Sequence, residues 1–392
     1  MDKRIISILI FTLFIFIPIL SQSNSIPIIA FMGVPANQSS DQSFKEFREA
    51  GFDICISNYN SLQEIKTALF YANKQGVKIM PRCWAILQNP LKAAQELKDY
   101  PALFGYHIFD EPDANKIKEL IPIVNKIMTV DPKHPCFINL LPYYGDGIFR
   151  ITKTKNYKEY LEVASQLRTP VISFDHYPIQ KNSIRQEWYQ NLEMVRKESI
   201  LTGKPFWGFI LSTPHLDYPQ PTLASLRLQA YVNLAYGAQA LQYYTYWTLK
   251  PHDNLDYHNG PINYNGKKTK TYNIVQKINA ELKQVGALFA DAKIISVHHL
   301  LKIPTGTTKQ PSMPMNLSKL SVKGTQGAVL STFSKQGHTY LAIVNKDYQH
   351  SLKIYIQAKN DIPKHVTKSN EIEHLKSNYS ITGGDLIIFR LE

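Results

Sequence analysis

The chain has 392 residues, enough for one large domain and a smaller one. Its hydrophobic fraction of 44% and charged fraction of 19% are those of a globular protein and exclude a largely disordered chain, and three cysteines are too few for a disulfide framework. The net charge of +13 comes from scattered Lys and Arg rather than from a basic block, which argues against a nucleic-acid-binding protein.

The N-terminus has the pattern of a secretory signal peptide over residues 1–23. Lys3 and Arg4 precede an apolar run at residues 5–20, and small residues follow where a signal peptidase would cleave. The run is short for a membrane-spanning helix, and no stop-transfer pattern comes after it. We therefore expect a secreted or periplasmic protein with no stable membrane insertion after cleavage.

Strand and helix patterns then alternate regularly. We expect strands at residues 27–34, 52–57, 77–83, 103–110, 136–141, 170–177, 206–212 and 240–247. We expect helices at residues 43–50, 61–76, 91–99, 114–130, 157–167, 184–201, 222–236 and 270–288, the first two opened by capping boxes at Ser43 and Ser61. Eight strand–helix units predict a (β/α)8 TIM barrel over residues 24–292. A doubly wound open sheet is the alternative, but no G-x-G-x-x-G follows any strand.

The pattern changes at about residue 293. Long helices give way to short alternating runs at residues 330–333, 339–345, 352–356 and 386–391, and a loose loop is expected at 305–315. Residues 293–392 therefore predict a small all-β, antiparallel C-terminal domain. Such a domain either braces the barrel or binds a ligand of its own.

The fourth predicted strand ends abruptly at Asp110-Glu111-Pro112. Two carboxylates this close raise one another's pKa, and a general acid needs a raised pKa. The same residues would also suit the start of a helix, where the helix dipole favours acids. In a TIM barrel, however, active sites lie at the C-terminal ends of the strands. The place of the pair in the chain therefore favours catalysis.

Amides, hydroxyls and aromatic rings collect at the other strand ends. Aromatic faces stack on the C–H faces of sugars, and amide, imidazole and phenol groups hydrogen-bond to sugar hydroxyls. The candidates for substrate binding are Asn58, Trp84, Asn139, Tyr143, His176, Tyr177, Tyr244 and Trp247. We expect an oligo- or polysaccharide substrate and, because no phosphate loop or cofactor lysine is evident, no cofactor. The positive charge fits an acidic polysaccharide through steering, and fits a generally basic surface equally well.

Three stretches carry a resemblance to a known group of enzymes. They are residues 105–112 around Asp110-Glu111-Pro112, residues 174–178 around Asp175, and residues 235–247. Together they resemble secreted TIM-barrel glycoside hydrolases of gut Bacteroidetes, related loosely to the family 42 β-galactosidases of clan A. Clan-A enzymes carry their acid/base as a Glu before Pro at the end of strand four, so the resemblance implies a glycosidase with Glu111 as general acid/base.

The chain departs from that family at strand seven, where clan-A enzymes place a nucleophilic Glu. Here the strand ends in Ser212-Thr213, and the next carboxylate is Asp217. Three alternatives stay open. Asp110 orients a substrate acetamido group that itself attacks, as in families 20 and 123. Asp175 is the second carboxylate, and its distance from Glu111 decides between inversion and retention. Or the barrel is catalytically inactive and only binds glycan.

A metal-dependent enzyme is a further alternative. His176, His215 and Asp175 are possible ligands, but no Cys/His cluster has the spacing of a zinc site. We therefore expect no metal.

Overall fold

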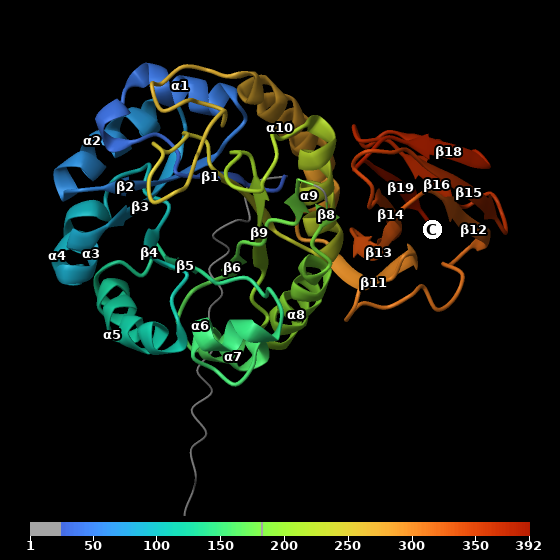
Figure 1. Cartoon of the computed structure of the whole chain (residues 1–392), viewed down its shortest axis with the longest axis horizontal. Coiled ribbons are helices and arrows are strands. Elements are labelled where there is room, and N and C mark those ends of the chain that lie inside the picture. Colours follow the sequence, from blue (N-terminus) through green and yellow to red (C-terminus); the bar gives the residue numbers. More distant parts are fainter. Residues whose placement is uncertain (1–24, 182) are drawn as a thin grey trace, which may run out of the picture.

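The computed structural model describes residues 25–181 and 183–392. The predicted signal peptide lies outside these residues. A ring of strands surrounded by helices forms the first part of the chain, and a separate group of strands lies at its side (Figure 1). Among the helices of the described residues, none is both long and apolar enough to cross a membrane.

Eight parallel strands close into a barrel. They are β1 (Ile28–Phe31), β2 (Ile54–Tyr59), β3 (Lys78–Cys83), β4 (Tyr106–Asp110), β5 (Cys136–Asn139), β6 (Ile172–Phe174), β9 (Phe206–Leu211) and β10 (Ala240–Tyr244). Hydrogen-bonded pairing runs β3-β2-β1-β10-β9-β6 and, separately, β4-β5. Parallel bridges from Ile79 to Leu103 and from Leu140 to Phe174 join the two groups on both sides. The predicted (β/α)8 barrel is therefore confirmed.

The helices cover the outside of the barrel. They are α1 (Asp41–Glu49), α2 (Leu62–Lys74), α3 (Trp84–Gln88), α4 (Pro90–Leu97), α5 (Ala114–Val130), α6 (Phe149–Thr152), α7 (Tyr157–Ser165), α8 (Glu187–Thr202), α9 (Leu223–Tyr236) and α10 (Lys270–Phe289). Short 3-10 turns lie at Ala36–Gln38 and Asp146–Ile148. Ser61 caps α2 as expected, but the prediction that Ser43 opens the first helix is wrong. Ser40 is the cap there, because its hydroxyl accepts the Ser43 backbone N–H at 3.2 Å.

A small hairpin replaces the start of the helix predicted at residue 184. Strands β7 (Ile179–Gln180) and β8 (Ser183–Ile184) pair antiparallel, and α8 begins only after them. The backbone N–H of Arg185 donates to the Pro178 carbonyl at 2.8 Å, which ties the end of β8 to the residue before β7. The hairpin stands beyond the end of β6 and brings Arg185 to the barrel mouth.

Large apolar side chains fill the inside of the barrel. Phe137 and Trp207 stack with ring centroids 5.0 Å apart, and Phe31 meets Phe209 edge-on at 5.9 Å. Gly208 on β9 leaves room for the buried side chain of Asn233 from α9. The barrel is thus a packed core, and only its two ends are available to a ligand.

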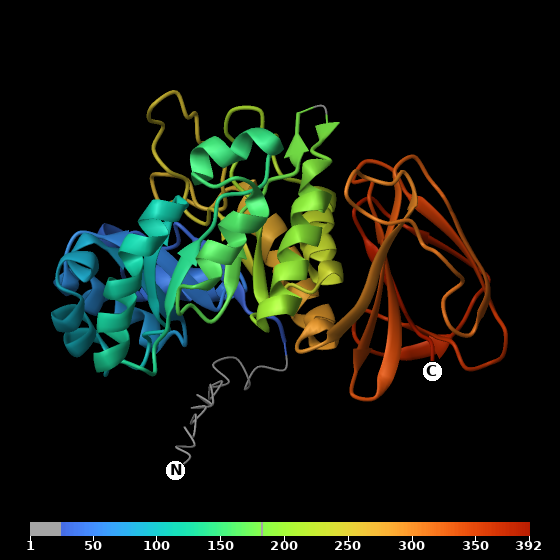
Figure 2. The same cartoon turned by 90° about the horizontal axis from the view of Figure 1, so that it is seen from below.

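The C-terminal region is all antiparallel. Its strands are β11 (Lys293–Leu301), β12 (Leu317–Lys323), β13 (Gly327–Lys335), β14 (His338–Asn345), β15 (Leu352–Ala358), β16 (Lys364–Val366), β17 (Ile372–His374), β18 (Asn378–Ile381) and β19 (Leu386–Arg390). They form one six-stranded and one three-stranded sheet. This β-domain lies beside the barrel (Figure 2), and β11, β13 and β14 contact α9. The change from α/β to β elements comes between α10 and β11.

Candidate active site

Three carboxyl groups meet at the C-terminal end of the barrel. Asp110 is the last residue of β4, Glu111 follows it, and Asp175 follows β6. Because β4, β5 and β6 are neighbours, their carboxyl ends lie at the same edge. Glu111 has a left-handed backbone, with φ of 52°, and its N–H donates to the Asn139 carbonyl at 2.8 Å. A non-glycine residue held in this conformation is strained, and such residues cluster at functional sites.

The carboxyl groups of Glu111 and Asp175 are close enough for each to shift the pKa of the other. Burial, and next the neighbouring charge of Asp110, raise the pKa of Glu111 to about 7. Burial and the charge of Glu111 raise the pKa of Asp175 as well. At neutral pH the pair holds a proton that it can give up.

A chain of hydrogen-bonded amide and hydroxyl groups holds the Asp175 carboxyl group in place. Asn139 Nδ2 donates to Asp175 Oδ1 at 2.7 Å, and Asn139 Oδ1 accepts the Ser173 hydroxyl at 2.9 Å. Gln242 Nε2 in turn donates to Ser173 Oγ at 2.7 Å. The Tyr177 hydroxyl also hydrogen-bonds to Asp175. The sequence proposed Asn139 and Tyr177 as substrate ligands, and the structure joins both directly to a carboxyl group.

Asp110 has a different environment from the other two acids. Its carboxylate lies 3.4 Å from the guanidinium of Arg82 on β3, and both side chains are about one-third exposed, at 28% and 32%. Burial raises the pKa of Asp110, while Arg82 and a hydrogen bond from Asn139 oppose that rise. Asp110 is thus the one acid of the three that has a cation beside it.

The end of β9, the seventh barrel strand, is filled by hydroxyl groups. Ser212 and Thr213 are buried, and both donate to the Thr245 carbonyl, at 2.8 and 3.2 Å. Their hydrogen bonds are satisfied within the protein. Asp217, the next carboxylate, is exposed on the following loop. The position of a clan-A nucleophile therefore holds no acid in this part of the described chain.

An aromatic wall borders the β9–β10 side of the mouth. It consists of Tyr177, His215, Tyr218, Tyr244 and Tyr257. The Tyr177 ring lies 5.7 Å from that of Tyr244 and 5.8 Å from that of Tyr218, and the Tyr257 ring lies 4.7 Å from His215. The hydroxyls of Tyr244 and Tyr257 share a hydrogen bond of 2.8 Å. Rings that carry hydroxyls present both stacking faces and hydrogen-bond donors to a sugar.

His176 has an unused acceptor. Asn191 Oδ1 accepts a hydrogen bond from the Tyr143 backbone N–H at 2.9 Å, which fixes the orientation of the Asn191 amide. The same oxygen lies 3.0 Å from His176 Nδ1. Nδ1 must therefore be the protonated nitrogen, since burial lowers the pKa of His176 to about 3 and keeps the ring neutral. Nε2 is then an acceptor, buried and without a partner among the described residues.

The other predicted substrate residues divide into two groups. Trp84, at the start of α3, is 66% exposed, and Asn58 is exposed at the end of β2. Tyr143 is buried, its hydroxyl donates to Asp146 at 2.9 Å, and its ring packs on Tyr157. Trp247 is 9% exposed, and its backbone N–H donates to the Met32 carbonyl. Tyr143 and Trp247 thus belong to the packed framework.

Two residues of the mouth were missing from the predicted set of substrate residues. Tyr144, next to Tyr143, is 41% exposed and its ring meets His176 edge-on at 4.6 Å. Arg185 lies over the same ring, with its guanidinium carbon 4.6 Å from the centroid. Tyr144 was visible in the sequence as the second of two tyrosines. The hairpin that carries Arg185 was read as helix, so nothing directed attention to it.

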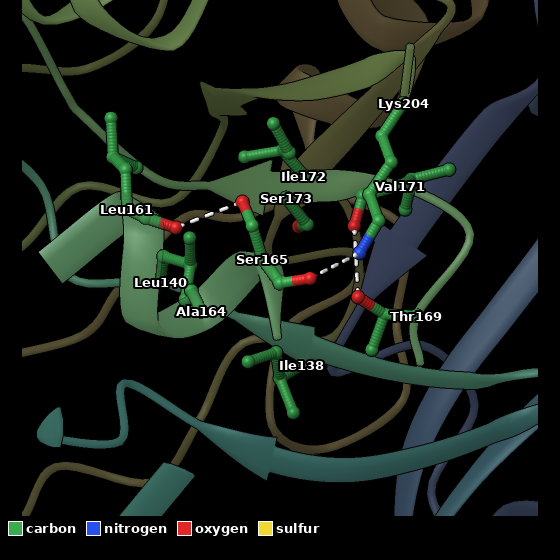
Figure 3. A pocket seen from close by; sticks show the side chains of 10 residues that line it. All are labelled: Ile138, Leu140, Leu161, Ala164, Ser165, Thr169, Val171, Ile172, Ser173 and Lys204. Carbon is green, nitrogen blue, oxygen red and sulfur yellow. Dashed lines mark hydrogen bonds between the residues drawn. The ribbon is translucent and has the colours of Figure 1, made fainter. Parts of the chain in front are cut away.

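Neither of two other concave regions competes with this site. A crevice beside β5, β6 and α7 has a volume of about 10 Å³, room for a water molecule, and Lys204 reaches across it to the Ser165 carbonyl (Figure 3). A cleft of about 920 Å³, lined by Asp53, Lys78 and Phe104 among others, lies at the N-terminal ends of the strands. Within the described chain no three His, Cys, Asp or Glu side chains gather as a metal site.

Comparison with known proteins agrees with this geometry. Residues 124–285, less than half of the chain, match the model of glycoside hydrolase family 42, described as beta-galactosidase. The barrel is a glycosidase barrel. The predicted resemblance to TIM-barrel glycoside hydrolases is confirmed, although the matched segment contains Asp175 and not Asp110 or Glu111.

Solved structures share the fold at very low identity. A beta-galactosidase from Bacillus circulans sp. alkalophilus has a TM-score of 0.65 at 10% identity, and the match covers 95% of this chain and 100% of that one. A catalytic mutant of a family 42 β-galactosidase from G. stearothermophilus has a TM-score of 0.61 at 7% identity, covering 94% and 98%. A beta-galactosidase from Halorubrum lacusprofundi has a TM-score of 0.50 at 11% identity, covering 68% of this chain and 62% of that one. No curated protein matches the sequence.

Proposed function

We propose that this protein hydrolyses a glycosidic bond at the Asp110–Glu111–Asp175 cluster, with Glu111 as the proton donor. The place of Glu111 supports this role, because it follows β4 at the C-terminal end of the barrel, beside Asp110 and near Asp175, where active sites of this fold lie. Burial raises the pKa of Glu111 to about 7, and a general acid with such a pKa is protonated enough to act near neutral pH.

The role of second carboxylate falls to Asp110 or Asp175. Retention by a covalent intermediate needs carboxyl groups roughly 5–5.5 Å apart and inversion roughly 6.5–9.5 Å apart. The carboxyl groups of Glu111 and Asp175 shift the pKa of one another, so Asp175 suits a proton partner of Glu111. Asp110, beside Arg82, is the acid best placed to stay ionised and to orient or stabilise a positively charged intermediate.

Aryl glycosides of different leaving groups test these roles. We expect Glu111→Gln to lower kcat/KM on phenyl glycosides by ~10²–10⁴-fold and to affect dinitrophenyl glycosides far less, because that leaving group needs no proton. Asp110→Asn should reduce both. Asp217→Asn, at an exposed acid of the next loop, is the control. Equal activity of wild type and Glu111→Gln on phenyl glycosides would refute the assignment.

The acetamido alternative has its own test. If a substrate acetamido group is the nucleophile and Asp110 orients it, 2-acetamido glycosides are hydrolysed and their 2-hydroxy counterparts are not. If the protein supplies the nucleophile, both are hydrolysed. The anomer formed first, read by NMR, then separates retention from inversion.

The second candidate is a glycan-binding barrel without turnover. The hydroxyl-filled end of β9 favours it, since the usual nucleophile is missing there. In that case a bound glycan survives intact with wild-type protein over days, as judged by mass spectrometry. A secreted or periplasmic location stays a prediction that detection of the cleaved mature N-terminus would test.

A further inference from the structure

Arg185 lies beside two aromatic rings at the barrel mouth. It follows strand β8 of the hairpin at the barrel mouth, and its guanidinium carbon lies 4.6 Å from the ring centroid of Tyr144 and 5.7 Å from that of Tyr218. Within the described part of the chain its side chain makes no hydrogen bond and no ion pair within 4.0 Å of a carboxylate. Arg82, by contrast, pairs with Asp110.

A guanidinium group that lies over aromatic rings is partly dehydrated and held in place, and both effects favour binding of an anion. The Arg185 guanidinium lies over aromatic carbon, so water is partly removed from it, while its N–H groups have no hydrogen-bond partner in the described part of the chain. The N–H edge of a guanidinium matches a carboxylate or sulfate with two parallel hydrogen bonds. Holding the group in place beforehand also reduces the entropy lost when the ligand binds.

The charge of Arg185 acts on two residues of the barrel mouth, Tyr144 and His176. The charges of Asp175 and Arg185 both act on the Tyr144 hydroxyl, which hydrogen-bonds to Tyr218. The charge of Arg185 also acts on His176, whose Nε2 is a buried acceptor without a partner in the described chain. A ligand beside Arg185 thus meets a cation and the hydroxyl-bearing ring of Tyr144.

We infer that Arg185, stacked on Tyr144 and Tyr218, is a specificity-determining residue that binds an anionic substituent, a carboxylate or a sulfate, on the glycan. The inference rests on the proposed glycosidase function and names its substrate class. The net charge of +13 would assist the approach of such a polyanion.

Binding to an inactive variant tests this without turnover. Full-length Glu111→Gln protein is titrated calorimetrically with galacturonate and glucuronate oligosaccharides, with their carboxyl-reduced neutral counterparts, and with sulfated oligosaccharides. We expect one acidic series to bind at least ~10-fold more tightly than the neutral series, and adding Arg185→Gln to remove ~10–100-fold of that affinity. Arg185→Lys should restore part of it. The series that responds identifies carboxylate or sulfate.

The control is Arg168→Gln, at an exposed arginine after α7. Equal binding of acidic and neutral glycans, or an acidic preference that survives Arg185→Gln, overturns the inference, as does failure of every acidic glycan to bind. Failure of the proposed function looks different, because wild type would then bind glycans without cleaving any. Thermal unfolding of each variant excludes loss of fold as the cause.

Discussion

The carboxyl groups of Glu111 and Asp175 meet at the mouth of the barrel although they are 64 positions apart in the chain and follow different barrel strands. Burial raises the pKa of both groups, so a proton is held where an enzyme of this fold needs a proton donor. The usual nucleophile position, at the end of β9, is occupied by Ser212 and Thr213. Proton donation is therefore the better supported half of the mechanism.

The pH dependence of kcat/KM should follow the titration of Glu111. Burial raises its pKa to about 7, so the protonated, donating form is lost as pH rises through that value. We expect kcat/KM for phenyl glycosides to fall about tenfold per pH unit above ~7. Dinitrophenyl glycosides, which need no proton donor, should show no such fall. An identical alkaline limb for both leaving groups would assign it to another group.

Asn139 should position Asp175. In Asn139→Ala, Asp175 and Ser173 each lose a buried hydrogen-bond partner, which costs ~1–3 kcal/mol of stability and displaces the proton-sharing pair. We expect the alkaline pKa of kcat/KM to move as well as kcat to fall. Loss of stability with an unchanged pH profile would give Asn139 a purely structural role.

Trp84 offers an exposed ring at the barrel mouth. Its side chain is 66% exposed, so Trp84→Ala should leave stability within about 0.5 kcal/mol. If sugars stack on it, KM should rise about fivefold, the equivalent of ~1 kcal/mol, with little change in kcat. Phe70→Ala, at a 54% exposed ring on α2, is the matched control and should change neither constant.

Gly208 should be required for the closure of the barrel. A Cβ at this position would lie 2.0 Å from Asn233 Oδ1, and Asn233 is buried and hydrogen-bonded to the Phe209 and Gln229 carbonyls. Gly208→Ala should therefore cost ~1–3 kcal/mol in urea unfolding. Gly147→Ala, where nothing lies within 4 Å, should be nearly neutral. Equal losses of stability in Gly208→Ala and Gly147→Ala would show that the Asn233 side chain moves aside without cost.

Lys346 gives the contact between barrel and β-domain a pH dependence. It is buried, its Nζ contacts the Lys302 carbonyl and His299, and His299 Nε2 lies 2.9 Å from the Tyr236 hydroxyl of α9. Burial, and then the charge of Lys302, lower the pKa of Lys346 to about 7. In the unfolded chain the pKa of Lys346 is ~10.4. Between pH ~7 and ~10.4 the unfolded chain therefore binds one proton more than the folded protein. The free energy of unfolding should rise with pH in this range, by at most ~1.4 kcal/mol per pH unit.

Replacement of Lys346 by methionine measures how much the titration of Lys346 contributes to the pH dependence of stability. In Lys346→Met the difference in unfolding free energy from wild type should be constant below pH ~7 and change steadily above it, to the advantage of wild type. Denaturant unfolding at intervals from pH 6 to about 10 checks the slope. A difference independent of pH throughout would mean that Lys346 is hydrated and titrates normally.

The sequence by itself determined the barrel and the place of its principal acid. Regular alternation of apolar strands with capped helices needs only local patterns, and the run that ends in Asp110-Glu111-Pro112 marks the mouth of β4. Local patterns misplaced two features that depend on which nearby groups hydrogen-bond. Ser40 rather than Ser43 caps α1, and β7 and β8 pair with each other where a helix was predicted to begin.

Tertiary structure decided which side chains share the site. Tyr143 and Tyr144 are equivalent in the sequence, yet one packs against Tyr157 and the other lies under Arg185. Asp175 was a candidate second carboxylate in the sequence, and the closed barrel is what brought it near Glu111. Side-chain direction and burial arise from packing across the whole barrel, and they set the pKa values and contacts on which the chemistry depends.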